Sequence, residues 1–182
     1  VVDRNRESIR KELDAAAAKL QGAEQLANRY SAYKELFGYS ADEFPALKRA
    51  SDKLTLVDKL WTSIADWHLA KSVWMDGPLT KLNAEEVESK MQVFTADAFS
   101  LNRKIPSRVT EKFVATIDEF KPLMPLVMDL GNPALLSRHW DRLCDLLGKL
   151  YDPDKSFTLS KFLQWGISVH AETVNEISST AS

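Results

Sequence analysis

Cysteine, glycine and proline are all scarce in this chain of 182 residues. The single cysteine, Cys144, excludes an internal disulfide framework and a metal site built from several thiolates. A lone cysteine suits a reducing compartment, so we expect an intracellular protein. With 6 glycines and 7 prolines there are few residues that break a helix, which favours long helices.

Long apolar runs and blocks of one charge sign are also missing. No apolar run approaches the roughly 20 residues that span a bilayer, and the first ten residues, VVDRNRESIR, lack the apolar centre of a signal peptide. Acidic and basic residues are mixed along the chain, and the formal net charge is −2. The composition therefore disfavours binding to nucleic acid or to a membrane.

Helical periodicity dominates what is present. Between residues 3 and 37 the apolar positions step by three and four, which predicts a helix of about 35 residues and about 50 Å. The predicted seam consists of Ile9, Leu13, Ala16, Leu20, Ala23, Ala27, Tyr30 and Phe37. No segment alternates with a period of two, so we predict an all-α fold, an elongated bundle of long antiparallel helices with no sheet.

A second long helix is predicted from near Asp42 to Gly77, with Pro45 in its first turn. The middle of this helix is apolar around most of its circumference, so it must lie between at least two neighbours. We expect the helix at 3–37 and a later helix to cover it. Its tryptophans are assigned to the core: Trp61, Trp67 and Trp74.

Shorter helices follow. Asn83 is the predicted N-cap of a helix over 84–104, and a further helix is predicted to run to about Lys121. Pro122 and Pro125 make the next stretch short and bent. The chain ends in helical periodicity without a stop signal, and we expect it to be part of a longer polypeptide.

The segment GNPALLSRHW at 131–140 predicts a capped helix start. Gly131 suits a left-handed turn, Asn132 an N-cap and Pro133 the first helical position. Helical phase then places Trp140 in the core and Arg138 in solvent, with His139 at the boundary. The predicted buried stripe is Leu136, Trp140, Leu143, Leu147 and Leu150.

Chemical interpretations of the same segment are weaker. A metal-binding His139 would need partners at ligand spacing, and HExxH is absent; His68 and His170 also lack such partners. A nucleophilic Cys144 would need a nearby base that the sequence does not suggest, so we interpret it as a small hydrophobic residue.

Two further ligand motifs fail. The segment at 152–163 begins like a calcium loop with Asp152, Asp154 and Ser156, but Phe157 and Leu163 replace the required glycine and glutamate. No phosphate-binding loop is present. The tryptophans are better explained by core packing than by a ligand cage. We therefore expect no catalytic residue, no cofactor and no metal.

Three strings, in this order and at these separations, resemble the N-terminal part of the linker region of a dynein heavy chain. They are LWTSIADWHLAKSVWMDGPLTKLNAEEVE, LNRKIPSRVTEKFVATIDEFKPLMPLVMDLGNPALLSRHWDRL and FTLSKFLQWGISVHAETVNEISSTAS. The resemblance starts near residue 54 and is strongest over 120–143. The form NPALLSRHW is more similar to axonemal than to cytoplasmic heavy chains. Its structural signature is Asn132, Pro133, Arg138, His139 and Trp140.

The resemblance implies a helical lever that lies across a ring of AAA+ modules and moves with the nucleotide state of that ring. The implied partners are the ring of the same heavy chain and other dynein chains, with the microtubule only indirectly involved. The implied location is the cytoskeleton of a cilium or flagellum. Residues 51–182 are then the helical linker segment. Residues 1–50 are a long helix, which is either generic or the end of the tail entering the linker.

Two alternatives stay open. A static helical scaffold that binds partner proteins, similar to spectrin-like or solenoid proteins, would also use long seamed helices, although no repeat of fixed period is visible. An enzyme with its active site around His139 is the weakest of the three hypotheses.

Overall fold

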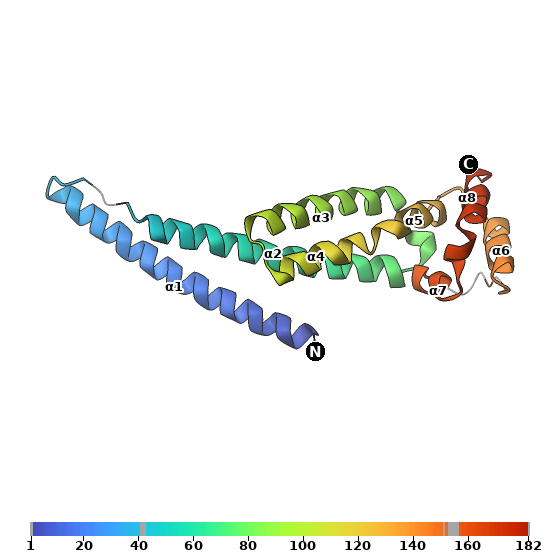
Figure 1. Ribbon diagram of the computed structural model, residues 1–182, viewed down its shortest axis with the longest axis horizontal. Helices are drawn as coiled ribbons and strands as arrows, with labels where there is room; N and C mark the ends of the chain where they lie inside the picture. Colours follow the sequence, from blue (N-terminus) through green and yellow to red (C-terminus); the bar gives the residue numbers. More distant parts are fainter. Residues whose placement is uncertain (1, 41–42, 151, 153–156, 182) are drawn as a thin grey trace. The chain divides into compact units, whose positions relative to one another are not determined.

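The structure, a computed structural model, describes residues 2–40, 43–150, 152 and 157–181 (Figure 1). These residues form helices and no strand; the β-type pairing among them is an isolated antiparallel bridge between Pro78 and Thr158. The predicted all-α fold without a sheet is thus confirmed for the described part of the chain. The chain divides into two units, Val1–Thr62 and Ser63–Ser182.

The first unit is a helical hairpin. Helix α1 (Val2–Leu36) and the first part of helix α2 (Pro45–Asp76) have opposite chain directions, and both extend to the same side of the connection between them (Figure 1). Gly38 follows α1 with a φ of 78°, a left-handed conformation that glycine adopts without strain. Pro45 is the first residue of α2, where its missing N–H costs nothing. The predicted start near Asp42 lies outside the described residues.

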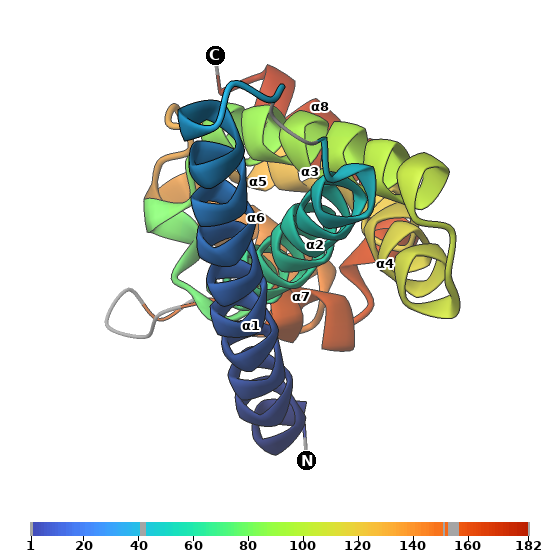
Figure 2. The ribbon, with the colours of Figure 1, turned by 90° about the vertical axis from the view of Figure 1, so that its left-hand side faces the viewer.

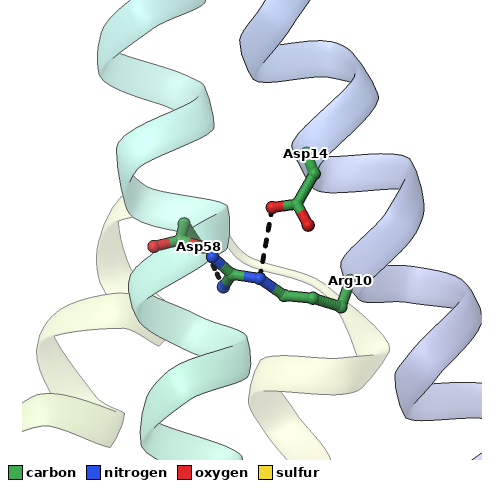
Figure 3. Close-up of polar contacts among 3 residues, drawn as sticks. All are labelled: Arg10, Asp14 and Asp58. Carbon is green, nitrogen blue, oxygen red and sulfur yellow. Dashed lines mark hydrogen bonds and ion pairs between the residues drawn. The ribbon is translucent and has the colours of Figure 1, made fainter.

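Apolar burial in this hairpin is slight. Among its described side chains only Ala27 and Leu60 are buried. An ion pair joins the two helices, because Arg10 Nη1 donates to Asp58 Oδ1 at 2.7 Å, and Arg10 Nε lies 3.3 Å from Asp14 Oδ1 (Figure 3). All three side chains are largely exposed, and such pairs contribute at most about 1 kcal/mol each. The hairpin is therefore weakly held by its own contacts.

The predicted seam of α1 is right at Ile9, Leu13, Leu20 and Ala27, which are partly covered or buried, and wrong at its other four positions. Ala16 and Ala23 are exposed, and the side chains of Tyr30 and Phe37 are 59% and 78% exposed. Beyond Leu20 the partly covered positions include Glu24 and Ser31, each one residue past a predicted seam position, and Lys34, which lies in phase with the seam. A straight helix rotates by about 20° per heptad relative to a 3.5-residue repeat, so one partner helix cannot follow a single seam over its whole length.

The second unit has a packed aromatic core. Helix α3 (Ala84–Lys104) and helix α4 (Arg108–Asp118) lie alongside the second half of α2 (Figures 1 and 2). Trp67 of α2 meets Phe94 and Phe120 edge-on, with ring centroids 5.4 and 5.8 Å apart. The ring centroid of Trp74 lies 6.0 Å from that of Trp67, and Trp74 is also buried. Two tryptophans at helical spacing are thus enclosed by later helices.

Trp61 differs from these two tryptophans. Its side chain is only partly buried, so its assignment to the core is corrected. The reason is its position, because Trp61 belongs to the sparsely packed first unit whereas Trp67 and Trp74 belong to the second.

Side-chain caps fix the ends of α3 and α4. Asn83 Oδ1 accepts the N–H of Glu86 at 3.2 Å, as expected of an N-cap. Ser107 and Thr110 form a reciprocal capping box at the start of α4. Helix α4 ends at Asp118, three residues before the predicted Lys121, because a 3₁₀ turn, η2 (Lys121–Leu123), follows it.

The remaining elements are short. They are η1 (Leu79–Lys81), α5 (Met124–Leu130), α6 (Ser137–Leu146), α7 (Leu159–Gln164), η3 (Ile167–His170) and α8 (Ala171–Ser179). The proline-rich stretch after α4 is short, as the sequence predicted, and comprises η2 and α5. In the described part of the chain, no helix has both the length and the apolar character required to cross a membrane.

Candidate functional site

The turn between α5 and α6 carries most of the residues that the sequence singled out, and it begins at Gly131. The φ of Gly131 is −86°, so the predicted left-handed conformation is wrong. Its N–H donates to the carbonyl of Val127 at 2.9 Å. A Cβ atom at this position would lie 2.9 Å from both Ala84 Cβ and the Val127 carbonyl oxygen. Glycine is needed here because α3 begins against the end of α5.

Asn132 ties the turn to α8. Its Oδ1 accepts the N–H of Ala134 at 2.9 Å, while its Nδ2 donates to the carbonyl and hydroxyl oxygens of Ser178, both at 3.0 Å. Asn132 therefore caps a turn and not a helix, which corrects its predicted role as the N-cap of α6. Pro133 lies in this turn and is exposed, so its placement at the first helical position is also wrong.

His139 supplies the cap of α6 from inside the helix. The N-cap residue, Leu136, has an extended backbone, and its N–H donates to His139 Nδ1 at 3.0 Å. This contact is the one that Glu or Gln makes at the same position of a capping box. The imidazole folds back over the first turn and is only 4% exposed, so the predicted boundary position is corrected to a buried one.

The His139 ring is disposed to stay neutral. Burial lowers its pKa, and the positive charges of Arg138 and Arg142 lower the pKa further. Arg138 Nε lies 3.1 Å from His139 Nε2, on the opposite edge from Leu136. A neutral imidazole has one acceptor nitrogen, so His139 accepts from only one of these two donors at a time. It holds the helix start and has no free basic nitrogen to offer a substrate.

Trp140 faces inward and Arg138 faces solvent. The Trp140 side chain is 6% exposed and meets Phe162 of α7 edge-on at 6.2 Å. Phe162 also contacts Phe157 and Trp165, at 5.8 and 5.6 Å. These four rings, which we call the C-terminal aromatic cluster, fasten α6 to α7.

The predicted leucine stripe needs correction at its ends. Leu143 is buried, but Leu136 is 54% exposed, Leu150 is 91% exposed and Leu147 is only partly buried. Helix α6 spans only Ser137–Leu146, so these three leucines lie outside it and do not follow its phase. The late start of α6 explains Leu136, and its end at Leu146, before Gly148 with a φ of 62°, explains Leu147 and Leu150.

Cys144 is buried and carries a suppressed thiolate. Burial raises the pKa of its thiol, and the negative charges of Asp141 and Asp145 raise the pKa further. The thiol form is therefore favoured, which is unsuited to a nucleophile.

No group of three or more His, Cys, Asp or Glu side chains is placed to hold a metal ion among the described residues. His170 is partly buried, and His68 is exposed and takes part in an interaction. The calcium-like segment is not testable in this way, because Asp154 and Ser156 lie outside the described residues.

Two open grooves were not predicted from the sequence. One lies between α2 and α3 in the second unit, has a volume of about 510 Å³ and is bordered by Asp66, Val73, Lys90, Val93 and Asp97. The other lies between α1 and α2 in the first unit and has a volume of about 540 Å³. Periodicity marks an apolar face but not whether a neighbour covers it, so sequence alone gave no signal for either groove.

Comparison with known families identifies the chain. The family model described as "Dynein heavy chain, N-terminal region 2" matches residues 47–182, which include α2 from its third residue onward and the helices described after it. The chain belongs to the dynein heavy chain family. The structural signature of the α5–α6 turn therefore lies within a dynein heavy chain segment.

Curated relatives agree with this assignment. The dynein-1-beta heavy chain of the flagellar inner arm I1 complex of Chlamydomonas reinhardtii is 30% identical over 175 residues, or 93% of this chain. Human dynein axonemal heavy chain 1 is 26% identical over 95% of this chain, and human dynein axonemal heavy chain 2 is 30% identical over 75% of it. The match spans only 4% of the length of the first of these relatives.

Proposed function

We propose that this chain is a non-catalytic mechanical linker segment of an axonemal-type dynein heavy chain. In this role it transmits nucleotide-driven movement of the AAA+ ring, as a lever that docks on and leaves the ring. The ring of the same heavy chain is its main partner, other dynein chains are further partners, and the microtubule takes part only indirectly. Its proposed location is the axoneme of a cilium or flagellum, in keeping with the names of its relatives.

The family match over residues 47–182 is the observation that carries the proposal. Packing in the second unit supports it, because a lever must resist bending. Trp67, Phe94 and Phe120 form a close-packed core that joins α2 to α3 and to the turn between α4 and η2. Close-packed interiors have low compressibility and transmit strain, so this arrangement is stiff.

The chemistry of the α5–α6 turn fits a segment without catalysis. His139 is engaged as a helix cap, and Cys144 is buried as a thiol. His139 and Cys144 thus have roles in capping and packing. We expect the purified chain of 182 residues to show no ATP hydrolysis above a buffer blank.

The lever role is tested in a full-length heavy chain that carries this segment. Trp67→Ala would empty a core site without touching the rest of the motor. We expect ATP hydrolysis by the motor to persist while microtubule gliding velocity falls by about half or more, because a softened lever transmits less of each stroke. Lys112→Ala, an exposed change on α4, is the control and should leave both quantities unchanged.

The scaffold alternative gives a different result. A static module that only binds partner proteins would leave the velocity per assembled motor unchanged when Trp67 is replaced. Hydrogen exchange of α3 and α4 would verify that the variant is softened and still folded. Unchanged gliding with a demonstrably softened segment would contradict the lever.

A further inference from the structure

The hairpin of α1 and α2 leaves apolar surface uncovered. Ile9, Leu13 and Leu20 of α1 are only partly buried, and the four alanines at 15–18 are all exposed. Small residues of this kind let a neighbouring helix approach closely. Two helices cannot enclose each other's apolar faces, so a third element would complete the packing.

A groove runs between these two helices. It is lined by apolar residues one turn apart on α1, and by apolar residues in steps of four and three on α2. These residues are Ala16 and Leu20 on α1, and Ala50, Leu54 and Val57 on α2. Because they repeat at helical spacing on both walls, the groove fits the ridge of another α-helix better than an extended strand.

The charges at the groove carry one sign. Its lining includes Lys19 from α1 and Lys53 from α2, and no acidic residue. Both lysine side chains are exposed. A helix seated between them would place residues at the edges of its apolar stripe beside the two ammonium groups, as e and g residues do in a coiled coil. Glutamate or aspartate at those edges would be attracted, and lysine or arginine repelled.

We propose that this groove is a docking site for an amphipathic α-helix with acidic residues on both edges of its apolar stripe. The occupant completes a three-helix arrangement with α1 and the first part of α2. Its small residues face Ala16 and Ala50, and its acidic edges face Lys19 and Lys53. This binding activity is separate from the lever role and stands or falls independently of it.

The test uses the full chain and a pair of designed peptides. Each peptide has about three heptads with the same Leu and Ala residues at positions a and d. One peptide has Glu at positions e and g, and the other has Lys there. Fluorescence anisotropy should show the Glu peptide binding about tenfold more tightly than the Lys peptide, equivalent to about 1.4 kcal/mol.

Charge reversal assigns the effect to the groove. The double variant Lys19→Glu/Lys53→Glu should invert the preference and bind the Lys peptide more tightly. The control variant Lys81→Glu/Lys112→Glu makes the same charge change at exposed positions of the second unit and should leave the preference unchanged. A second variant, Leu54→Asp, should weaken both peptides, because it places a charge on the apolar floor of the groove.

Four results would overturn the proposal. The first is equal affinity for the two peptides, and the second is no binding of either. The third is an equal effect of the groove and control charge reversals, since that would reflect net charge and not the site. The fourth is a dimer of the chain, seen by sedimentation, that Leu54→Asp abolishes, because a second copy would then be the occupant in place of the acidic helix.

Discussion

The backbone N–H of Leu136 donates to Nδ1 of His139 at 3.0 Å, which makes a histidine the internal cap of α6. The bond caps α6 at its first residue, Ser137, and the ring that accepts it is buried. It also makes the start of α6 sensitive to pH, because a protonated imidazole is a donor at both nitrogens and cannot accept the N–H.

The His139 cap should therefore fail on acidification. The pKa of His139 in the fold lies below its ordinary value of 6.5, so the unfolded chain binds more protons in the interval between the two values. Stability conferred by the neutral ring is present above pH 6.5 and is lost as the pH falls through that interval. Urea denaturation at a series of pH values from neutral to mildly acidic should show this decline.

His139→Gln provides the matched comparison. Glutamine can accept the Leu136 N–H as in a standard capping box but does not titrate in this range. Its stability should decline less on acidification than that of the parent chain. His170→Gln makes the same substitution at a histidine outside α6 and is the matched control. Identical pH profiles for the parent and His139→Gln would rule out the protonation mechanism.

Trp140 and Arg138 should differ sharply in their effect on stability. Trp140→Ala removes a ring of the C-terminal aromatic cluster and should cost about 3 to 5 kcal/mol. Arg138→Ala changes an exposed side chain and should cost less than about 0.5 kcal/mol unless Arg138 contacts a partner. Chemical denaturation of both variants checks the assignment, and equal losses would contradict it.

Gly131→Ala should destabilise the chain through a steric clash. The new Cβ would lie 2.9 Å from Ala84 Cβ and from the Val127 carbonyl oxygen, so α3 or α5 must shift. Such overpacking costs typically about 1 to 3 kcal/mol. Gly22→Ala is the opposite control, because nothing lies within 4 Å of that Cβ and the residue is inside α1. It should stabilise α1 by roughly 0.5 to 1 kcal/mol. If the melting temperatures of both variants lie above that of the parent chain, or both lie below it, the packing explanation fails.

Asn132→Asp should loosen α8 from the α5–α6 turn. An aspartate can still accept the Ala134 N–H but cannot donate to Ser178, whose carbonyl oxygen it would face unfavourably. The expected cost is about 1 to 3 kcal/mol, with faster hydrogen exchange in α8. Asn175→Ala, which removes an exposed hydrogen bond to Asp129 on α5, should cost less. A larger loss of stability for Asn175→Ala than for Asn132→Asp would show that the part-buried contact between Asn132 and Ser178 is not the dominant one.

Local signals in the sequence predicted much of the fold. The bounds of α3 follow from an N-cap at Asn83 and a proline at 106, and both act through their immediate neighbours. The long α1 and α2 follow from periodicity without helix breakers. These features depend on residues within a few turns of each other, so they can be predicted from the sequence.

The α5–α6 turn resisted prediction because local signals there compete with tertiary contacts. Asn132 has the side chain of an N-cap, but it bonds to Ser178, 46 residues away. Gly131 has the residue type of a left-handed turn, but close packing against Ala84 is what requires it. Helix α6 begins at Ser137, later than predicted, and Leu136 therefore lies outside it.

Helical periodicity and short signature strings are properties of neighbouring residues, so the all-α fold and the membership of the dynein heavy chain family can be recognised from the chain alone. Which apolar faces are covered becomes known only from the folded structure. Trp67 and Trp74 are enclosed, whereas Trp61 and the groove lined by Lys19 and Lys53 remain accessible. Burial depends on the neighbours that folding brings from distant parts of the chain, and the spacing along one helix does not contain that information.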